Sequence, residues 1–177
     1  PVLTRSQFLT LAEVGEREGV LDEKESEIIR NLLRFRRVEV GAVMTPRTVG
    51  MFAPQSMTAQ EFVTRNPDPK FSRIPVHEPD APDHVTGYVL KDDILQLVSR
   101  SEDAPLESLK RDILVVPETG RIPRLFEQFL DKREHIALVV DEFGGVAGVV
   151  TMEDVIETML GLEIVDEKDG IADMQKL

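Results

Sequence analysis

The stretch DEFGGVAGVVTMEDVIE, residues 141–157, decides how this 177-residue chain folds. A predicted apolar strand, residues 138–141, ends at the start of this stretch. Two glycines at 144 and 145 are typical of a hairpin turn, and Val146–Val150 follows as a second strand. A helix is predicted to begin at Thr151, directly after that strand. The N-terminus of a helix presents free N–H groups and the positive end of the helix dipole, so this turn suits a phosphate group.

Thr151 and Asp154 allow two interpretations of this turn. In the first, the threonine hydroxyl donates to a phosphate, and Asp154, one turn into the helix, accepts hydrogen bonds from two ribose hydroxyls. In the second, the two residues form a capping box that only starts the helix. The first interpretation is favoured because the chain contains the same unit twice.

The order strand, helix, strand, strand, helix occurs twice after residue 44. The elements are expected at 49–54, 58–66, 73–76, 85–90 and 92–100, and again at 113–117, 122–132, 136–141, 146–150 and 152–160. Gly87 and Asp93 in the first copy correspond to Gly148 and Asp154 in the second. A copy of about 60 residues is too small to bury both faces of its sheet. We therefore expect an α+β fold in which two copies pack sheet to sheet about a pseudo-twofold axis, with equivalent clefts between them.

A helical segment precedes the repeats. Capping-box patterns at Thr4 and Asp22 predict two helices, and Pro46 ends the helical region because it forces the preceding residue out of the α conformation. The first helix is expected to bury one apolar face, formed by Phe8, Leu11, Ala12 and Val14. Four parts are thus predicted: an acidic helical segment at 1–43, a first repeat at 44–101, a second repeat at 106–167 and a polar tail at 168–177.

The charges of the helical segment leave alternatives open. Its exposed face carries many acids, which are either simply solvated or form a weak site for a divalent cation. Its basic patch, Arg34, Arg36 and Arg37, either pairs with those acids or faces a lipid surface or a neighbouring domain.

The overall composition narrows the classes of function. Thirty-three acidic residues against 21 basic ones give a net charge of −12, so nucleic acid is not an expected partner. A free polyanionic nucleotide is disfavoured for the same reason, whereas a nucleotide complexed with a divalent cation is not. The sequence has no cysteine, and no apolar run approaches the roughly 20 residues of a membrane helix. Both ends look cut, so we expect a soluble fragment of a larger protein.

The element order, with Gly148 and Asp154 at the last strand and helix, resembles a pair of CBS domains. A finer resemblance is to the CorC/CNNM family of magnesium and cobalt transport proteins. Five segments carry it in the family's order: EREGVLDEKE at 16–25, VMTPR at 43–47, FSRIPVHE at 71–78, VVDEFGGVAGVVTMEDVIE at 139–157 and EIVDEKD at 163–169.

This resemblance implies a function as well as a fold. The parent would be a membrane protein with a transmembrane domain, and the acidic helices and CBS pair would lie on the cytoplasmic face of the cell membrane. The CBS pair would form a homodimer, bind ATP with Mg²⁺ between its repeats and couple this binding to ion transport. The alternative is a CBS module that senses adenine nucleotides for another transporter or for an enzyme.

The resemblance also assigns residues to the site. The expected nucleotide-binding residues are Thr45, Phe71, Arg73, Pro75, Thr151 and Asp154. Phe71 would lie near the adenine and Arg73 near the phosphates. Glu153 is the expected contact to Mg²⁺, although a solvated glutamate favoured by the helix dipole explains it equally well. Leu90 replaces the threonine in the first repeat, so the second cleft is expected to be empty or weak.

Catalysis is not expected from this sequence. It contains no P-loop, no nucleophile elbow and no Ser/His/Asp arrangement in a recognisable context. A nucleotide hydrolase would need a base that activates water, and Glu153 is the only candidate for one.

Overall fold

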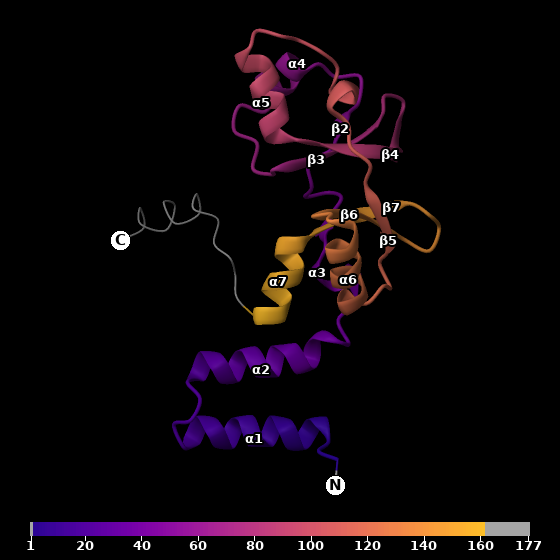
Figure 1. The fold of residues 1–177 in the computed structure, drawn as a ribbon. Coiled ribbons are helices and arrows are strands. Elements are labelled where there is room, and N and C mark those ends of the chain that lie inside the picture. Colours follow the sequence, from indigo (N-terminus) through magenta and orange to yellow (C-terminus); the bar gives the residue numbers. More distant parts are fainter. Residues whose placement is uncertain (1, 162–177) are drawn as a thin grey trace.

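The computed structural model of this chain describes residues 2–161, which form three parts arranged one after another (Figure 1). A hairpin of two helices lies at one end, the second repeat lies next to it, and the first repeat lies at the far end. The helices are α1 (Arg5–Arg17), α2 (Glu23–Phe35), α3 (Val40–Val43), α4 (Ala59–Arg65), α5 (Lys91–Ser99), α6 (Ile122–Lys132), α7 (Met152–Leu160) and the 3-10 helix η1 (Leu106–Leu109). The strands are β1 (Thr45–Pro46), β2 (Ala53–Pro54), β3 (Arg73–Glu78), β4 (Ala81–Leu90), β5 (Leu114–Pro117), β6 (Ile136–Val140) and β7 (Val146–Thr151).

The two helices of the hairpin begin where the sequence predicts. Gln7 donates its backbone N–H to the hydroxyl of Thr4, and its side chain accepts from the N–H of Thr4. Asp22 and Glu25 exchange the same pair of bonds at the start of α2. Each capping box satisfies two N–H groups that a helix end otherwise leaves without a partner, so the local sequence is sufficient to set both starts.

The two sheets confirm the tandem repeat. In the first repeat β2 is parallel to β3 and β3 is antiparallel to β4, and in the second β5, β6 and β7 repeat this arrangement. Each repeat has a core between its sheet and its helices. A third cluster joins the repeats, because it combines Tyr88, Leu90 and Phe52 from the first with Leu138 and Val149 from the second. The sheets therefore pack against each other, as expected for an α+β pair of CBS-like repeats.

One strand crosses from the helical side into the second repeat. β1 lies at the very start of the first repeat in sequence, but it pairs with β7 and completes the sheet order β1-β7-β6-β5. Gly148 permits this approach, since a Cβ atom there would overlap the carbonyl oxygen of Thr45. Arg111 makes the matching exchange: it pairs with Tyr88 of β4, and a Cβ atom on Gly87 would overlap its carbonyl oxygen. Each sheet is thus extended at one edge by residues that belong to the other repeat.

Some elements differ from the sequence prediction. The strand expected at 49–54 is reduced to Ala53–Pro54. β4 begins at Ala81, whereas the sequence predicts its start at residue 85, so the hairpin strands of the first repeat are longer than expected. The EIVDEKD segment at 163–169, the end of the second repeat and the polar tail at 168–177 lie outside the described residues.

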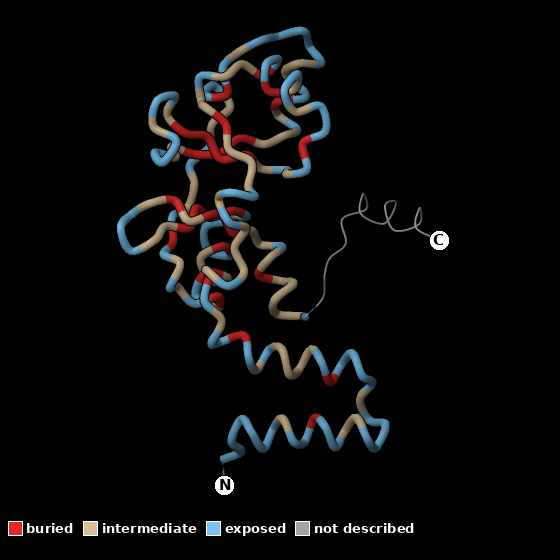
Figure 2. Tube along the Cα trace, turned by 180° about the vertical axis from the view of Figure 1, so that it is seen from behind, coloured by how far each residue is buried: buried red, intermediate tan, exposed pale blue. Residues whose placement is uncertain are grey.

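The predicted buried face of α1 was wrong. Ala12 is buried, but Phe8, Leu11 and Val14 are 46, 53 and 44 % exposed. The reason is that α1 packs mainly on α2, whose other contacts are with α7, so a single neighbour covers only one side of α1. Figure 2 shows that most of this helix is exposed and that a single buried position interrupts it.

Candidate functional site

A cleft of about 440 Å³ lies between the two repeats. Its lining residues come from β1, from the segment that leads into β3, and from the sheet and last helix of the second repeat. They are Thr45, Lys70, Phe71, Ser72, Arg73, Ile136, Val149, Thr151, Glu153, Asp154 and Glu157. The cleft thus gathers every residue that the sequence assigns to the site except Pro75.

Pro75 does not line the cleft. It is buried in the interior of β3, where it lies opposite Tyr88 of β4. The first residue of β3, Arg73, lines the cleft, and Pro75 lies two residues further along the strand. The segment FSRIPV was assigned to the site as a block, and only its first three residues, Phe71, Ser72 and Arg73, line the cleft.

The start of α7 forms one wall. Thr151 donates its backbone N–H to Oδ2 of Asp154 at 2.7 Å and its hydroxyl to the same oxygen at 2.9 Å. The N–H of Asp154 donates back to the hydroxyl oxygen at 3.3 Å. The capping box is therefore formed, and it uses the same two side chains that the first interpretation assigns to phosphate and ribose. Both side chains also line the cleft. Since the hydroxyl of Thr151 has a single proton, it must turn away from Asp154 to donate to a ligand, whereas it can still accept from the N–H of Asp154.

Burial changes the acidity of Asp154 in this wall. Removal from solvent raises the pKa of the Asp154 carboxyl, and the bonds from Thr151 oppose this effect only in part. Glu153, the next residue toward the helix start, adds a smaller contribution in the same direction. A carboxylate in this state gains from donors brought by a ligand, such as the two hydroxyls of a ribose.

The segment 70–73 forms the opposite wall and brings cations. Arg73 places Nη1 at 4.0 Å from Oε1 of Glu153, so an ion pair spans the cleft. Lys70 also lines it, although the sequence analysis did not identify this residue. Lys70 lies in an irregular segment after α4, where neither periodicity nor a motif marks a functional position. The position of Lys70 at the cleft depends on the path of the chain into β3, which local sequence does not reveal.

The cleft is suited to an anion that carries its own cation. Lys70 and Arg73 face three carboxylates across it, those of Glu153, Asp154 and Glu157. Among residues 2–161 no group of three or more His, Asp or Glu side chains is placed to hold a metal ion. A divalent cation in this cleft would therefore need ligands from a bound phosphate and from water, with Glu153 as a protein contact.

The pseudo-equivalent position in the first repeat, at the start of α5, is different. Leu90 caps α5 without a side-chain hydrogen bond, and Asp93 is engaged by Arg111, whose Nη2 lies at 2.9 Å from Oδ2. Tyr88 donates its hydroxyl to Glu134 at 3.3 Å. Burial, followed by the charge of Glu134, raises the pKa of this tyrosine. Asp93 therefore already has a cationic partner, which the sequence comparison of the two repeats did not reveal.

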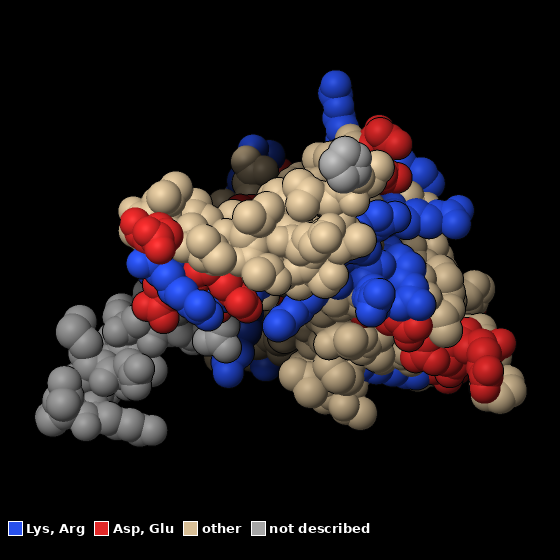
Figure 3. Space-filling view, turned by 90° about the horizontal axis from the view of Figure 1, so that it is seen from below, with Lys and Arg blue, Asp and Glu red and all other residues tan. Residues whose placement is uncertain are grey.

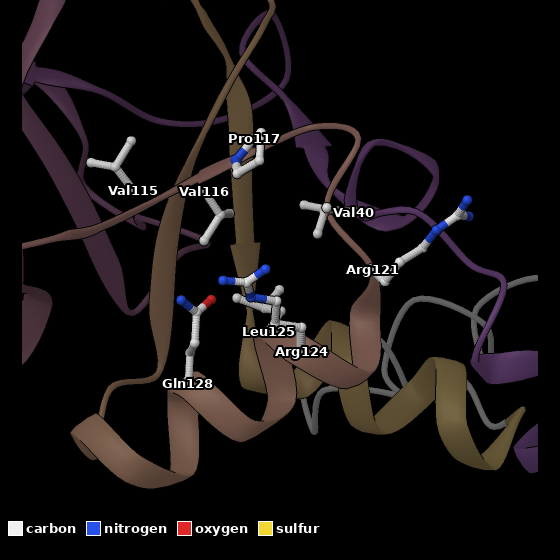
Figure 4. A pocket seen from close by; sticks show the side chains of 9 residues that line it. Val40, Val115, Val116, Pro117, Arg121, Arg124, Leu125 and Gln128 are labelled. Atoms are coloured by element: carbon white, nitrogen blue, oxygen red, sulfur yellow. The ribbon is translucent and has the colours of Figure 1, made fainter.

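A smaller pocket of about 200 Å³ lies on the other side of the second repeat, between α3, β5 and α6 (Figure 4). Its walls are mainly apolar, from Val40, Val116 and Leu125, and the side chains of Arg124 and Gln128 point toward Val116. It contains none of the predicted residues and no carboxylate for a ribose. The cleft between the repeats remains the candidate site.

Two packed β-α-β-β-α repeats with a cleft between them define a pair of CBS domains, and a family model described as CBS domain matches residues 106–161. The structure resembles the CBS domain of the bacterial CNNM/CorC family Mg²⁺ transporter in complex with the inhibitor IGN95a. The TM-score is 0.82 at 28 % identity, over 92 % of this chain and all of that one. A structure of such a CBS domain in complex with ATP matches with a TM-score of 0.73 at 30 % identity, over 79 % of this chain and 99 % of that one.

Sequence relatives point to the same family. A UPF0053 protein of Synechocystis sp. is 34 % identical over 178 residues, covering 100 % of this chain and 51 % of that protein. The magnesium and cobalt efflux protein CorC of Escherichia coli K12 is 32 % identical over 166 residues, covering 93 % of this chain and 56 % of that protein. The match to the ATP-bound CBS structure, at 30 % identity over 99 % of that chain, shows that the chain belongs to the CorC/CNNM family. It spans about half the length of the two sequence relatives. Within residues 2–161, no helix has the length and apolar character needed to cross a membrane.

Proposed function

We propose that this chain is the regulatory module of a CorC/CNNM-type magnesium or cobalt transporter, and that it binds ATP with Mg²⁺ in the cleft between its CBS repeats. The observation that carries this proposal is that Phe71, Arg73, Thr151 and Asp154, far apart in sequence, line one cleft. The relative solved with ATP supports the choice of nucleotide. The relatives are named as efflux proteins and transporters, which favours a regulatory role over a catalytic one.

Each wall of the cleft has a part in this proposal. The phosphates lie at the positive end of the α7 dipole, where the hydroxyl of Thr151 turns from Asp154 to donate to them, and Arg73 and Lys70 add charge. Phe71 packs on the adenine ring. Asp154 accepts from the ribose hydroxyls. Mg²⁺ neutralises the phosphates, which would otherwise face the carboxylates of the cleft, and Glu153 exchanges its ion pair with Arg73 for a contact to the hydrated metal.

The link from the cleft to the rest of the protein is short. Thr45 lines the cleft in β1, and the chain before it runs through α3 and α2, which packs on α7. A ligand that favours the closed cleft thus acts on β1 and α7, the two elements connected to the helical hairpin. It shifts the transporter only as far as its affinity differs between the open and closed states. We propose that the module works as a homodimer on the cytoplasmic face of the membrane, attached to the transmembrane domain of its parent.

Calorimetric titration with ATP, with and without Mg²⁺, tests this proposal. Thr151→Val removes the hydroxyl from the cleft and is expected to weaken binding at least tenfold, since a charge-assisted hydrogen bond contributes about 1.5–3 kcal/mol. The matched control is Thr58→Val, because Thr58 also caps its helix, α4, through a capping box but does not line this cleft. Both variants lose one helix cap, which costs roughly 1 kcal/mol of stability.

The comparison separates binding from folding. Loss of ATP binding in Thr151→Val but not in Thr58→Val supports the assigned site. Equal affinity in both variants would show that the threonine only caps α7. Failure of the unaltered chain to bind ATP, with or without Mg²⁺, would overturn the nucleotide-binding role.

A further inference from the structure

The outer side of α1 carries an apolar stripe, which we define as Phe8, Leu11 and Val14. All three side chains are exposed, and Val2 and Leu3, just before the helix, are exposed as well. At 100° per residue the stripe also includes Thr4, Gln7 and Gly15, none of which is charged. The same spacing puts the charged residues of the helix, Arg5, Glu13, Glu16 and Arg17, outside this sector. From Thr4 to Gly15 this side of α1 is therefore uncharged and largely apolar, and most of it faces solvent; the first charge in the same sector is Glu18, the C-cap residue at the end near the turn.

An arginine cluster lies at one end of this stripe. Arg5 donates Nη1 to the carbonyl oxygen of Leu33 at 3.3 Å, which holds the start of α1 beside the end of α2. Arg34, Arg36 and Arg37 follow at that end of α2, and all are exposed. Over residues 2–161 none of these four arginines forms an ion pair. The acids of the hairpin lie between residues 13 and 27, around the turn at its other end. Figure 3, viewed from the α1 side, shows the uncharged band and Lys and Arg side chains gathered at one end of it.

We propose that α1 lies on an anionic lipid surface, with the stripe at the acyl boundary and the arginine cluster on the headgroup phosphates. The partner must offer apolar and anionic groups side by side, which an anionic bilayer does. Three apolar side chains cover far less than the roughly 800 Å² per partner of a stable protein interface. They are enough for a helix that binds at the interface, because each basic residue adds about a fivefold gain in partition. This inference does not depend on nucleotide binding.

Charge complementarity decides the choice of lipid. The chain has a net charge of −12, so its surface as a whole is repelled by an anionic membrane. The arginine cluster is a local exception at the end of the hairpin remote from its acids. Binding is therefore expected to need this cluster, to fix the orientation of the hairpin and to decrease with salt.

Flotation of the whole chain with vesicles tests the proposal. Vesicles of equal parts phosphatidylglycerol and phosphatidylcholine are compared with vesicles of phosphatidylcholine alone, at low ionic strength and at about 0.5 M salt, where the Debye length is only a few ångströms. We expect binding to the mixed vesicles only, and its loss in high salt. Arg34→Ala/Arg36→Ala is expected to lower the partition roughly 25-fold, about fivefold for each arginine.

Matched variants locate the contact. Phe8→Ser/Leu11→Ser is expected to abolish flotation, and circular dichroism checks that the helices remain. The controls are Leu130→Ser on α6, where the leucine is 55 % exposed, and Arg100→Ala after α5. Neither control is expected to change flotation.

Three results would overturn the proposal. The first is absence of binding to the mixed vesicles, and the second is equal binding to both vesicle types. The third is a Phe8→Ser/Leu11→Ser variant that floats normally but has a lower mass in solution, since the stripe would then be covered by a second copy of the chain.

Discussion

At the scale of single residues, Asp154 combines two roles that set opposite demands on its carboxyl. As a capping residue it accepts from the N–H and the hydroxyl of Thr151, which favours the ionised form. As a buried group it loses solvation, which favours the protonated form and raises its pKa. A ligand that donates from two hydroxyls would relieve this conflict, because it replaces the lost water.

The raised pKa of Asp154 predicts a pH dependence of ATP binding. As the pH is lowered from about 7 toward the ordinary carboxyl range, Asp154 takes up a proton earlier than an exposed aspartate does. In the proposed complex with ATP, the ribose then loses its acceptor. Affinity measured by calorimetry is expected to decrease over this interval. Asp154→Asn should bind weakly at every pH and abolish the dependence. An unchanged slope in that variant would assign the titration to another group.

The raised pKa of Asp154 also makes the stability of the fold depend on pH in a defined direction. A carboxyl whose pKa is raised in the folded state binds its proton more tightly there than in the unfolded chain. Its contribution to stability is therefore present at low pH and is lost as the pH rises through the raised pKa. Urea unfolding of the chain without nucleotide should show this contribution, and Asp154→Asn should remove it. A pH dependence of unfolding that is identical in both proteins would contradict the assignment.

At the scale of elements, the sequence predicts what local chemistry decides. The capping boxes at Thr4 and Asp22 set the helix starts, and the repeated spacing of Gly87 with Asp93 and Gly148 with Asp154 identifies the two copies. These features were recognised because each is formed by residues close together in the chain. The resemblance then supplied the residues of the cleft, which local patterns alone do not join.

What the sequence did not predict depends on contacts between distant elements. Lys70 lines the cleft only because of how the chain enters β3, and Arg111 reaches Asp93 only because residues 110–111 cross to the other sheet. The face of α1 was misassigned for a related reason. Helical periodicity identifies an apolar side, but it does not tell whether a neighbour covers it.

The exchange of β1 into the second sheet predicts unequal effects of two glycine substitutions. Gly148→Ala places a methyl group against the backbone of Thr45 and Pro46, which cannot yield like a flexible side chain. We expect a loss of roughly 2–4 kcal/mol in the free energy of unfolding in urea, comparable to severe core overpacking. Gly15→Ala, inside α1, meets only the side chain of Leu21. It should leave stability unchanged or raise it by up to about 1 kcal/mol.

These two variants control each other, since each adds one methyl group. Equal effects would show that the close approach of β1 to β7 is not required. A loss of ATP affinity in Gly148→Ala, measured where the variant is folded, is also expected, because Thr45 lines the cleft from β1.

At the scale of the whole molecule, net charge opposes association. Each chain carries −12, and a homodimer through the CBS repeats brings two such charges together. Much of the negative charge of the helical hairpin lies around the turn between α1 and α2. Divalent cations screen this repulsion more effectively than monovalent ones.

Magnesium is therefore expected to strengthen the proposed homodimer. Sedimentation equilibrium should give a lower dimer dissociation constant in about millimolar Mg²⁺ than in chelator, and sodium chloride of equal ionic strength should have a smaller effect. A dissociation constant that is the same with chelator and with Mg²⁺ would contradict this prediction.

The pairing of β1 with β7 also has a consequence for synthesis on the ribosome. Thr45 is synthesised about a hundred residues before its partner Val149. The edge strand β1 therefore has no strand to pair with until most of this chain has been made. The first repeat likewise lacks Arg111 until its own last helix has been made. Such long-range pairing slows folding, and it makes completion of both repeats a late and joint event. A chain interrupted between the repeats therefore lacks both the partner strand of β1 and the contact of Arg111 with β4, and neither sheet can be completed.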